Sequence, residues 1–257
     1  MDRAEQLANG WEADAPVGDT LLRRALHNHA SAMLLPAVSV AARVDADGDV
    51  QLVDAGPRGW LLNSAVFLRP VLGPDDSVFD RADQLGGVAF AWSATPLPDL
   101  RERGWRPEGH PPLMLRPAGG SLPRAPEGLQ VCEVTDECVL NDFNHVVVDG
   151  YPAPPGTRIA GKAILEEPRF RMWVGYQDGR PVATSACAIA CGLNGVTLVA
   201  TLPEARGRGY GEGMTWRATL ADPALPSMLL ASDLGRPVYE RMGYVAISRF
   251  ALVRRER

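Results

Sequence analysis

The hydrophobic and polar positions of the N-terminal half alternate with two periods, one typical of helices and one typical of strands. Residues 19–38 carry apolar side chains every three or four positions, which predicts a helix that Asp19 caps and Pro36 ends. Its apolar stripe holds Leu21, Leu22, Ala25, Leu26, His29 and Met33. Short apolar runs predict strands at 48–53, 63–69, 88–93 and 112–116, and we expect helices at 76–85 and 97–103. Gly86-Gly87 should end the helix at 76–85.

The C-terminal half repeats the same two signals in a different order. Asp178-Gly179 lies between two apolar runs, which predicts a tight hairpin, and Thr135 is a suitable cap for a helix at 136–149. The expected strands are 129–134, 170–176, 181–190, 195–201, 228–232 and 244–253, and the further helices are 212–221 and 236–242. The order β-α-β-β-β-α-β-α-β indicates an α+β fold with a mixed central β-sheet flanked by helices.

A stretch dense in Pro, Gly and Ala divides the chain. It predicts an N-terminal domain at 1–117, a linker at 118–128 and a C-terminal domain at 129–257. Residues 90–116 and 229–254 resemble each other: each has a strand ending in serine, a short helix, a Gly-aromatic pair and an apolar strand ending in arginine. This suggests a tandem pseudo-repeat whose N-terminal half kept the scaffold and lost the chemistry, although two ordinary β-α-β stretches could match by coincidence.

Charge and cysteine content exclude some classes of function. The formal net charge is −5 with no basic block, so bulk charge gives no support for binding nucleic acid or an anionic membrane. No apolar run has membrane-spanning length, and the first residues are polar, so we expect a cytoplasmic protein with reduced thiols. The four cysteines form no CxxC pair and have no histidine beside them, so we expect no metal site.

The segment from Val199 to Gly211 carries the main functional signal, because a predicted strand runs through a glycine-rich turn into a predicted helix. Glycines let a ligand approach the main chain, and the first amides of a helix attract anions. Arg206 and Arg208 add charges that can bind phosphate oxygens. A kinase-type P-loop would need a lysine here, and a Rossmann fingerprint would need glycine where Glu212 stands.

Two motifs together resemble the GNAT superfamily of GCN5-related N-acetyltransferases. Arg206-x-x-Gly209-x-Gly211 resembles the pyrophosphate loop of that superfamily. Residues 230–244 resemble its last helix region, in which a tyrosine, here Tyr239, precedes a Gly-aromatic pair by four residues. Ser232 stands where the superfamily often has asparagine. With the hairpin at 174–186, the resemblance covers roughly residues 129–254.

The resemblance implies a transferase that moves the acetyl group of acetyl-CoA to a primary amine by direct attack. Strands 195–201 and 228–232 would splay apart, the pantetheine arm would lie between them, and main-chain amides would stabilise the thioester oxyanion. Tyr239 would protonate the leaving thiolate, or would only pack against the cofactor. The implied acetyl-CoA-binding residues are Val199, Ala200, Thr201, Arg206, Gly207, Arg208, Gly209, Tyr210, Gly211, Glu212 and Ser232.

The sequence leaves open the general base, the acceptor and two alternative functions. Asp149, Glu166 and Glu167 are candidates for the general base, but each could be a surface charge, and a water chain could serve instead. The acceptor is a small-molecule or peptide amine. A non-catalytic acyl-CoA-binding sensor, or a transferase for a longer acyl group, would use the same motifs.

The N-terminal half admits two interpretations. It could cover a sheet edge, giving a monomeric pseudo-dimer in place of a homodimer, or it could shape the acceptor pocket. Trp60, Trp92 and Trp105 are candidate wall residues, with core packing as the alternative for each.

Overall fold

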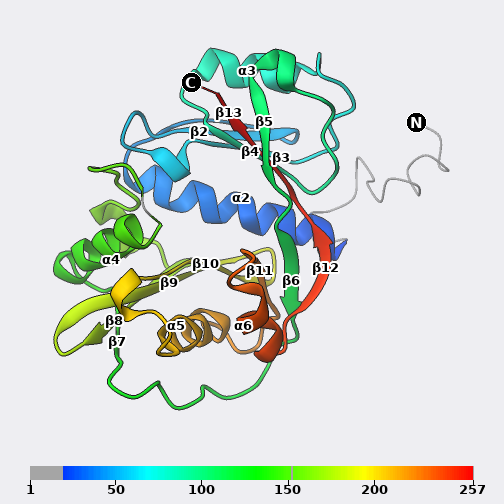
Figure 1. The fold of residues 1–257 in the computed structure, drawn as a ribbon. Helices are drawn as coiled ribbons and strands as arrows, with labels where there is room; N and C mark the ends of the chain where they lie inside the picture. Colours follow the sequence, from blue (N-terminus) through cyan, green and yellow to red (C-terminus); the bar gives the residue numbers. More distant parts are fainter. Residues whose placement is uncertain (1–19, 152, 257) are drawn as a thin grey trace.

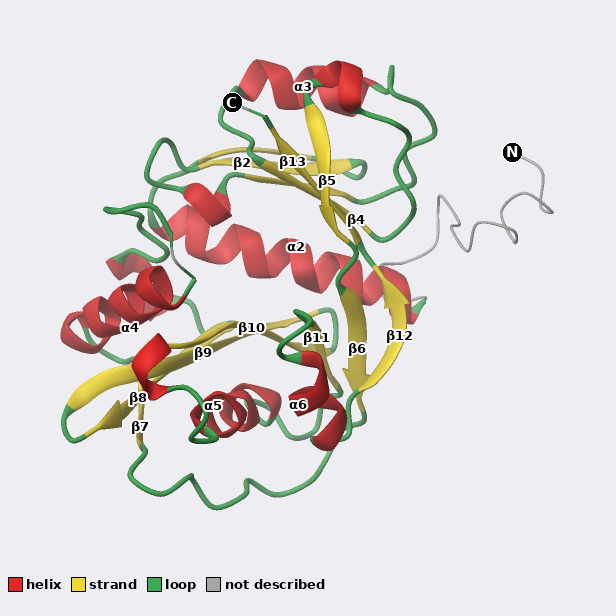
Figure 2. Cartoon of the chain, in the orientation of Figure 1, coloured by secondary structure: helices red, strands yellow, loops and turns green. Residues whose placement is uncertain are grey.

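Two mixed β-sheets enclose one long helix in the computed structural model, which describes residues 20–151 and 153–256. Helix α2 (Leu21–Ser39) lies between the sheets, and the other helices lie over their faces (Figures 1 and 2). Gln51 of one sheet donates a hydrogen bond to the carbonyl of Ala30 (2.8 Å), and Asn28 of α2 donates to carbonyls of the other sheet. The buried helix therefore binds both sheets through side-chain amides.

The first sheet has six strands in the order β1-β2-β3-β4-β13-β5. Its strands are β1 (Arg43–Ala46), β2 (Val50–Asp54), β3 (Ser64–Phe67), β4 (Phe90–Ser93), β13 (Ala251–Arg255) and β5 (Trp105–Gly109). Only β3 and β4 pair in parallel; the other neighbours are antiparallel. Helix α3 (Ser77–Leu85) connects β3 to β4 and packs Val78 and Phe79 into the core below it.

The second sheet has seven strands in the order β12-β6-β11-β10-β9-β8-β7. Its strands are β12 (Val245–Arg249), β6 (Pro112–Arg116), β11 (Ser227–Leu230), β10 (Leu193–Thr201), β9 (Arg180–Ala190), β8 (Phe170–Gln177) and β7 (Gln130–Glu133). Helices α2 and α4 (Glu137–Gly150) cover one face, while α5 (Tyr210–Thr219) and the short α6 (Arg236–Arg241) cover the other. Packing on both faces explains why most residues of β9 and β10 are buried.

The two halves of the chain exchange one strand each. Strand β6 comes from the N-terminal half and lies between β11 and β12, and β13 comes from the C-terminal end and lies between β4 and β5. The prediction of one strand at 244–253 is therefore wrong, because the chain leaves one sheet and enters the other at the buried Phe250. The predicted boundary at 118–128 stays a prediction, since each sheet takes strands from both sides of it.

The strand orders of the two sheets correspond. In each half a helix precedes three antiparallel strands, a second helix leads to a strand that pairs in parallel with the third, and the exchanged strand lies beside it. Apart from β7, which has no counterpart among the described residues of the first sheet, the two sheets share one strand order. The predicted α+β class with mixed sheets flanked by helices is observed. A tandem origin of the halves stays a prediction.

Local predictions had mixed outcomes. Asp178 and Gly179 both have positive φ (49° and 75°), as the predicted hairpin between β8 and β9 requires. Pro36 does not end α2, because it lies in the last turn, where the absence of its N–H removes only one hydrogen bond.

Two predicted helix caps also differ from the structure. Asp136, not Thr135, caps α4 by accepting hydrogen bonds from the amides of Cys138 and Val139. Thr20 caps α2, and Asp19 lies outside the described residues. The predicted helix at 97–103 is reduced to a single 3-10 turn at Arg101–Arg103.

Candidate functional site

Strands β10 and β11 form an open wedge. They pair in parallel only at Asn194↔Ser227 and Gly195↔Met228, although β10 continues to Thr201 and β11 to Leu230. The predicted parallel neighbours are therefore confirmed, and their pairing ends after two positions. Beyond that point, the edge of β10 that faces β11 has no partner strand among the described residues.

A bulge in β10 lies inside this wedge. The register against β9 shifts between Thr197 and Ala200, and Leu198 has a positive φ of 50°, which is unusual for a leucine. Two hydroxyl groups hold the bulge: Thr184 donates to the carbonyl of Leu198 (3.0 Å) and Tyr151 donates to the carbonyl of Val199 (3.1 Å). Side-chain hydrogen bonds thus satisfy carbonyls that lost their ladder partners.

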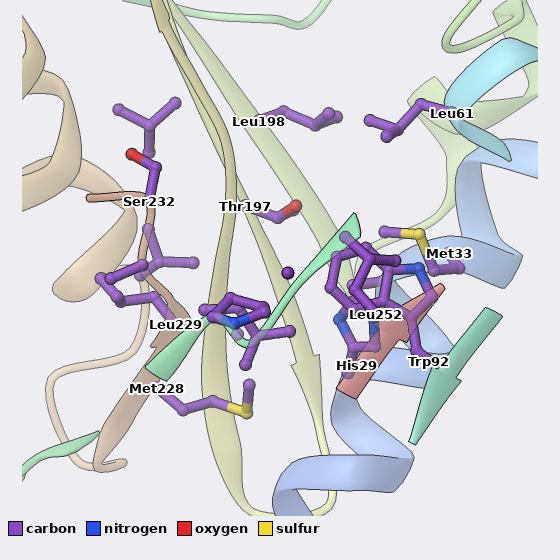
Figure 3. A pocket seen from close by; sticks show the side chains of 18 of the residues that line it. His29, Met33, Leu61, Trp92, Thr197, Leu198, Met228, Leu229, Ser232 and Leu252 are labelled. Atoms are coloured by element: carbon purple, nitrogen blue, oxygen red, sulfur yellow. The ribbon is translucent and has the colours of Figure 1, made fainter. Parts of the chain in front are cut away.

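A cavity of about 580 Å³ fills the wedge and extends to the N-terminal half. Figure 3 shows Ser232 and Leu229 on one side of the cavity and His29 and Trp92 on the other, with Thr197 between them. The walls come from α2, β4, β10, β11, the connection between β5 and β6, and the segment leading into α6. The cavity therefore lies between the two halves of the chain.

The glycine-rich turn presents main-chain amides next to this wedge. Gly207 and Gly209 both have φ of 77°, and Gly209 is the residue before α5. In the part of the chain that the structure describes, the N–H groups of residues 208–212 have no hydrogen-bond acceptor, and the first bond of the helix is from Gly213 to Gly209 (3.0 Å). A Cβ on Gly211 would lie 3.3 Å from the Thr201 hydroxyl, so helix and strand approach closely here. This arrangement can bind an anionic oxygen.

The charged side chains of the turn already have protein partners. Arg206 donates to the carbonyls of Thr201 (3.0 Å) and Gly150 (3.2 Å), and Arg208 donates to the side-chain oxygen of Gln177 (2.9 Å). Both guanidinium groups are exposed and keep further N–H groups for a ligand.

The other two predicted residues of this region also contact the protein. Glu212 lies 3.5 Å from Arg241. The buried ring of Tyr210 packs in the core with Met214, and its hydroxyl lies 3.5 Å from the carbonyl of Glu127. Its side chain therefore serves packing, while its amide belongs to the open helix end.

Tyr239 lies on α6 and lines the cavity together with Val199 and Ser232. Its ring packs over Gly235, where a Cβ would lie 3.0 Å from the phenol oxygen, and meets the ring of Tyr244 edge-on at 6.1 Å. Burial raises the pKa of Tyr239 above the usual value for a tyrosine, so the phenol keeps its proton at neutral pH. Burial also raises the pKa of Tyr151, and the nearby Tyr239 adds to that shift.

The N-terminal half contributes one buried titratable group to the cavity. His29 is 8% exposed, and its ring meets Trp92 edge-on at 4.7 Å and Phe250 at 5.8 Å. Its Nε2 is enclosed without a hydrogen-bond partner, and desolvation lowers its pKa to about 4. His29 is therefore a neutral imidazole in an apolar environment.

Sequence patterns missed two of the cavity residues. His29 entered only as a member of the apolar stripe of a helix, and Tyr151 follows α4 outside any motif. Of the three tryptophans considered as wall residues, Trp92 lines the cavity, Trp105 is buried in the core of the first sheet, and Trp60 packs edge-on against Phe90.

The residues considered as general bases lie elsewhere. Asp149 is exposed and lies 3.5 Å from Nδ1 of His145, while Glu167 pairs with Arg169 (2.7 Å). Neither these nor Glu166 is among the residues that line the cavity.

The described residues hold neither a metal-ligand cluster nor a membrane-spanning helix. Within residues 20–151 and 153–256, no three His, Cys, Asp or Glu side chains gather in a way that could hold a metal ion. No helix in the same ranges is long and apolar enough to span a bilayer.

The corresponding place in the first sheet is closed. Strands β3 and β4 pair at four successive positions, so no wedge opens between them. At the start of α3, the carboxylate of Asp76 accepts from the amide of Val78 (3.2 Å) and pairs with Arg69 (2.7 Å). The side chain of Asp76 thus caps the N-terminus of α3, whereas the N-terminus of α5 has no side-chain cap.

Three solved structures of similar fold carry names of the GNAT superfamily. A GCN5-related N-acetyltransferase from Kribbella flavida superposes with a TM-score of 0.62 at 20% identity, over 90% of this chain and 95% of that one. One from Sphaerobacter thermophilus gives 0.58 at 15% identity, over 98% and 89%. A putative acetyltransferase of the GNAT family from Novosphingobium aromaticivorans gives 0.57 at 19% identity, over 91% and 96%.

These likenesses span most of both chains and establish a shared fold. No protein-family model matches the chain, and no curated protein matches it. The chain therefore has the two-halved α+β fold of GCN5-related N-acetyltransferases, as the motifs predicted.

Proposed function

We propose that this protein is an N-acetyltransferase that moves the acetyl group of acetyl-CoA to a primary amine. The observation that carries the proposal is the wedge between β10 and β11, whose cavity is lined by Tyr239. The open amides of α5 lie near Thr201, at the end of β10. A fold shared with acetyltransferases supports it, since ligands of α/β sheets bind where neighbouring strands separate.

Each part of the site has a role in this proposal. The amides of residues 208–212 would bind the pyrophosphate, with Arg206 and Arg208 supplying charge. The pantetheine arm would follow the free edge of β10 at Val199–Thr201, and Ser232 would face it from the opposite side. Because Tyr151 and Arg206 already donate to the carbonyls of Val199 and Thr201, the ligand would share or displace those hydrogen bonds.

The chemical step follows from the same geometry. The neutral amine would attack the thioester carbonyl, forming a C–N bond, while main-chain N–H groups at the bulge of β10 stabilise the oxyanion. The C–S bond would then break, and Tyr239 would give its proton to the leaving thiolate. The attacking nitrogen would lose one proton to solvent, and solvent would return a proton to the phenolate of Tyr239. The raised pKa of Tyr239 suits this role because the phenol is protonated at neutral pH.

Calorimetric titration with CoA tests the binding site. We expect wild-type protein to bind CoA, and Gly209→Val and Arg206→Ala to weaken binding strongly. Gly179→Val is the matched control, because Gly179 has almost the same φ (75° against 77°) but lies in the hairpin between β8 and β9. Wild-type affinity in the Gly209 variant would remove the turn from the proposal.

Acetyl transfer to a panel of primary amines then tests the reaction. Thiol release that depends on an amine supports the transferase. CoA binding without transfer to any amine would instead indicate a non-catalytic acyl-CoA sensor.

The acceptor, the cellular location and the assembly state also belong to the proposal. We take the acceptor to be a small-molecule or peptide amine and the location to be cytoplasmic. The chain would act as a monomer, with the two halves forming a pseudo-dimer, or as a homodimer. Sedimentation analysis distinguishes the two assemblies by mass.

A further inference from the structure

We propose that the N-terminal half builds the acceptor end of the cavity, and that this end selects a primary amine carried on an apolar body over a polyamine or a lysine-rich peptide. This inference rests on the proposed function and names its substrate class. It depends on which side chains line the far end of the cavity and on where the charged groups of the cavity lie.

The far end of the cavity is apolar. Met33 and His29 reach it from α2, Leu61 from the turn after β2, Trp92 from β4 and Leu252 from β13 (Figure 3). Met33 is 5% exposed, and Trp92 and Leu61 pack against the same core. An aliphatic or aromatic body of an acceptor would therefore exchange water for apolar contacts on several sides.

The carboxylates that line the cavity belong to its rim. Glu108 and Asp233 are both exposed, and Glu108 pairs with Arg254 (2.9 Å). The lining guanidinium, Arg249, is also exposed and donates to the carbonyl of His110 (2.8 Å). Among the described residues that line the cavity, no buried carboxylate could pair with an ammonium group. A second positive charge on the acceptor would thus be buried without a partner, which is strongly unfavourable.

His29 reports the same environment. Desolvation lowers its pKa to about 4, so this part of the cavity disfavours a cation. The same effect would lower the pKa of an acceptor amine bound beside it and leave the amine neutral, as attack on a thioester requires. An apolar acceptor end would therefore supply a neutral amine without a buried carboxylate as general base.

Two amines of equal length test the inference directly. Hexylamine and cadaverine have the same number of heavy atoms, but cadaverine has a second ammonium where hexylamine has a methyl group. We expect kcat/KM to favour hexylamine by at least about a hundredfold, because the buried second charge has no partner. Calorimetry with CoA-saturated protein should give the same order of affinity without depending on turnover.

Leu61 allows a matched pair of variants, since it lines the apolar end but is only partly buried. Leu61→Glu supplies a carboxylate and should shift the preference toward cadaverine by at least about tenfold relative to wild type. Leu61→Gln has nearly the same size without the charge and should leave the preference for hexylamine in place. Unchanged CoA affinity in both variants shows that the fold and the cofactor site are intact.

The outcomes separate the two proposals. If CoA binds and cadaverine is preferred or equal, or if neither amine binds the CoA-saturated protein, the inference fails and the proposed cofactor site stands. If CoA does not bind, the proposed function fails and the inference falls with it.

Discussion

Gly195 and Asn28 form the contact that joins the two halves beside the cavity. Gly195 is the last residue of β10 that pairs with β11, and Asn28 of α2 is completely buried against it. A Cβ built on Gly195 would lie only 1.8 Å from Oδ1 of Asn28. The amide of Asn28 donates to the carbonyls of Ala188 (2.9 Å) and Leu193 (3.1 Å), so it cannot yield without losing hydrogen bonds.

The cost of Gly195→Ala follows from these contacts. Displacing Asn28 would break two buried hydrogen bonds, which we put at about 2–3 kcal/mol in total. Overpacking at the new methyl group adds about 1–3 kcal/mol. Gly195→Ala should therefore lower the free energy of unfolding by about 3–6 kcal/mol, and Asn28→Ala alone by about 2–3 kcal/mol. In the double variant the methyl group has room, so the loss should equal that of Asn28→Ala alone.

Urea unfolding of the wild type, both single variants and the double variant measures this cycle. We expect a coupling free energy of about 3 kcal/mol or more between the two positions. If the two losses simply add, the steric conflict between Gly195 and Asn28 is not what requires glycine at this position, and the reasoning is refuted.

Three other predictions concern the site. Tyr239→Phe should lower kcat at least about tenfold with little change in CoA affinity. If Tyr239 is the acid, the activity of the wild type should persist as pH rises and fall only above pH 10, because burial raises the pKa of Tyr239 from 10.0. His29 binds a proton near pH 6.5 in the unfolded protein but only near pH 4 in the native protein, so the free energy of unfolding should fall as pH drops from about 6.5 toward 4. His29→Gln should make this fall with pH smaller in urea titrations, and an unaltered pH dependence would contradict the lowered pKa. Tyr151→Phe should cost about 1–3 kcal/mol in urea unfolding by leaving the Val199 carbonyl unpaired, and an unchanged free energy of unfolding would argue against a role in holding the bulge.

Sequence patterns predicted the parts of the fold that depend on local chemistry. The hairpin at Asp178-Gly179 was predictable because its turn needs two positive φ angles, which that pair of residues adopts readily. The glycine-rich turn was predictable for the same reason, since Gly207 and Gly209 both need a left-handed backbone. Tyr239 could be placed because it belongs to a motif of fixed spacing.

Sequence patterns did not predict which sheet a strand joins. The apolar residues of β6 and β13 would alternate in the same way in either sheet, so periodicity contains no information about the exchange. His29 had the spacing of a core residue in α2, and only the packing of that helix against β4 and β10 makes it a wall of the cavity. Tyr151 donates to the carbonyl of Val199, which is free only because β10 has a bulge. A leucine at position 198 does not predict that bulge, although its φ is positive there.

The strand exchange has a consequence for how the chain folds during synthesis. Strand β13 is made long after β4 and β5, yet it lies between them in the first sheet. Until residues 251–255 have left the ribosome, the first sheet lacks the strand between β4 and β5, and each of these two strands has an unpaired edge. Contacts of such long sequence separation slow folding, so the nascent N-terminal half should depend on chaperone protection until β13 has been made.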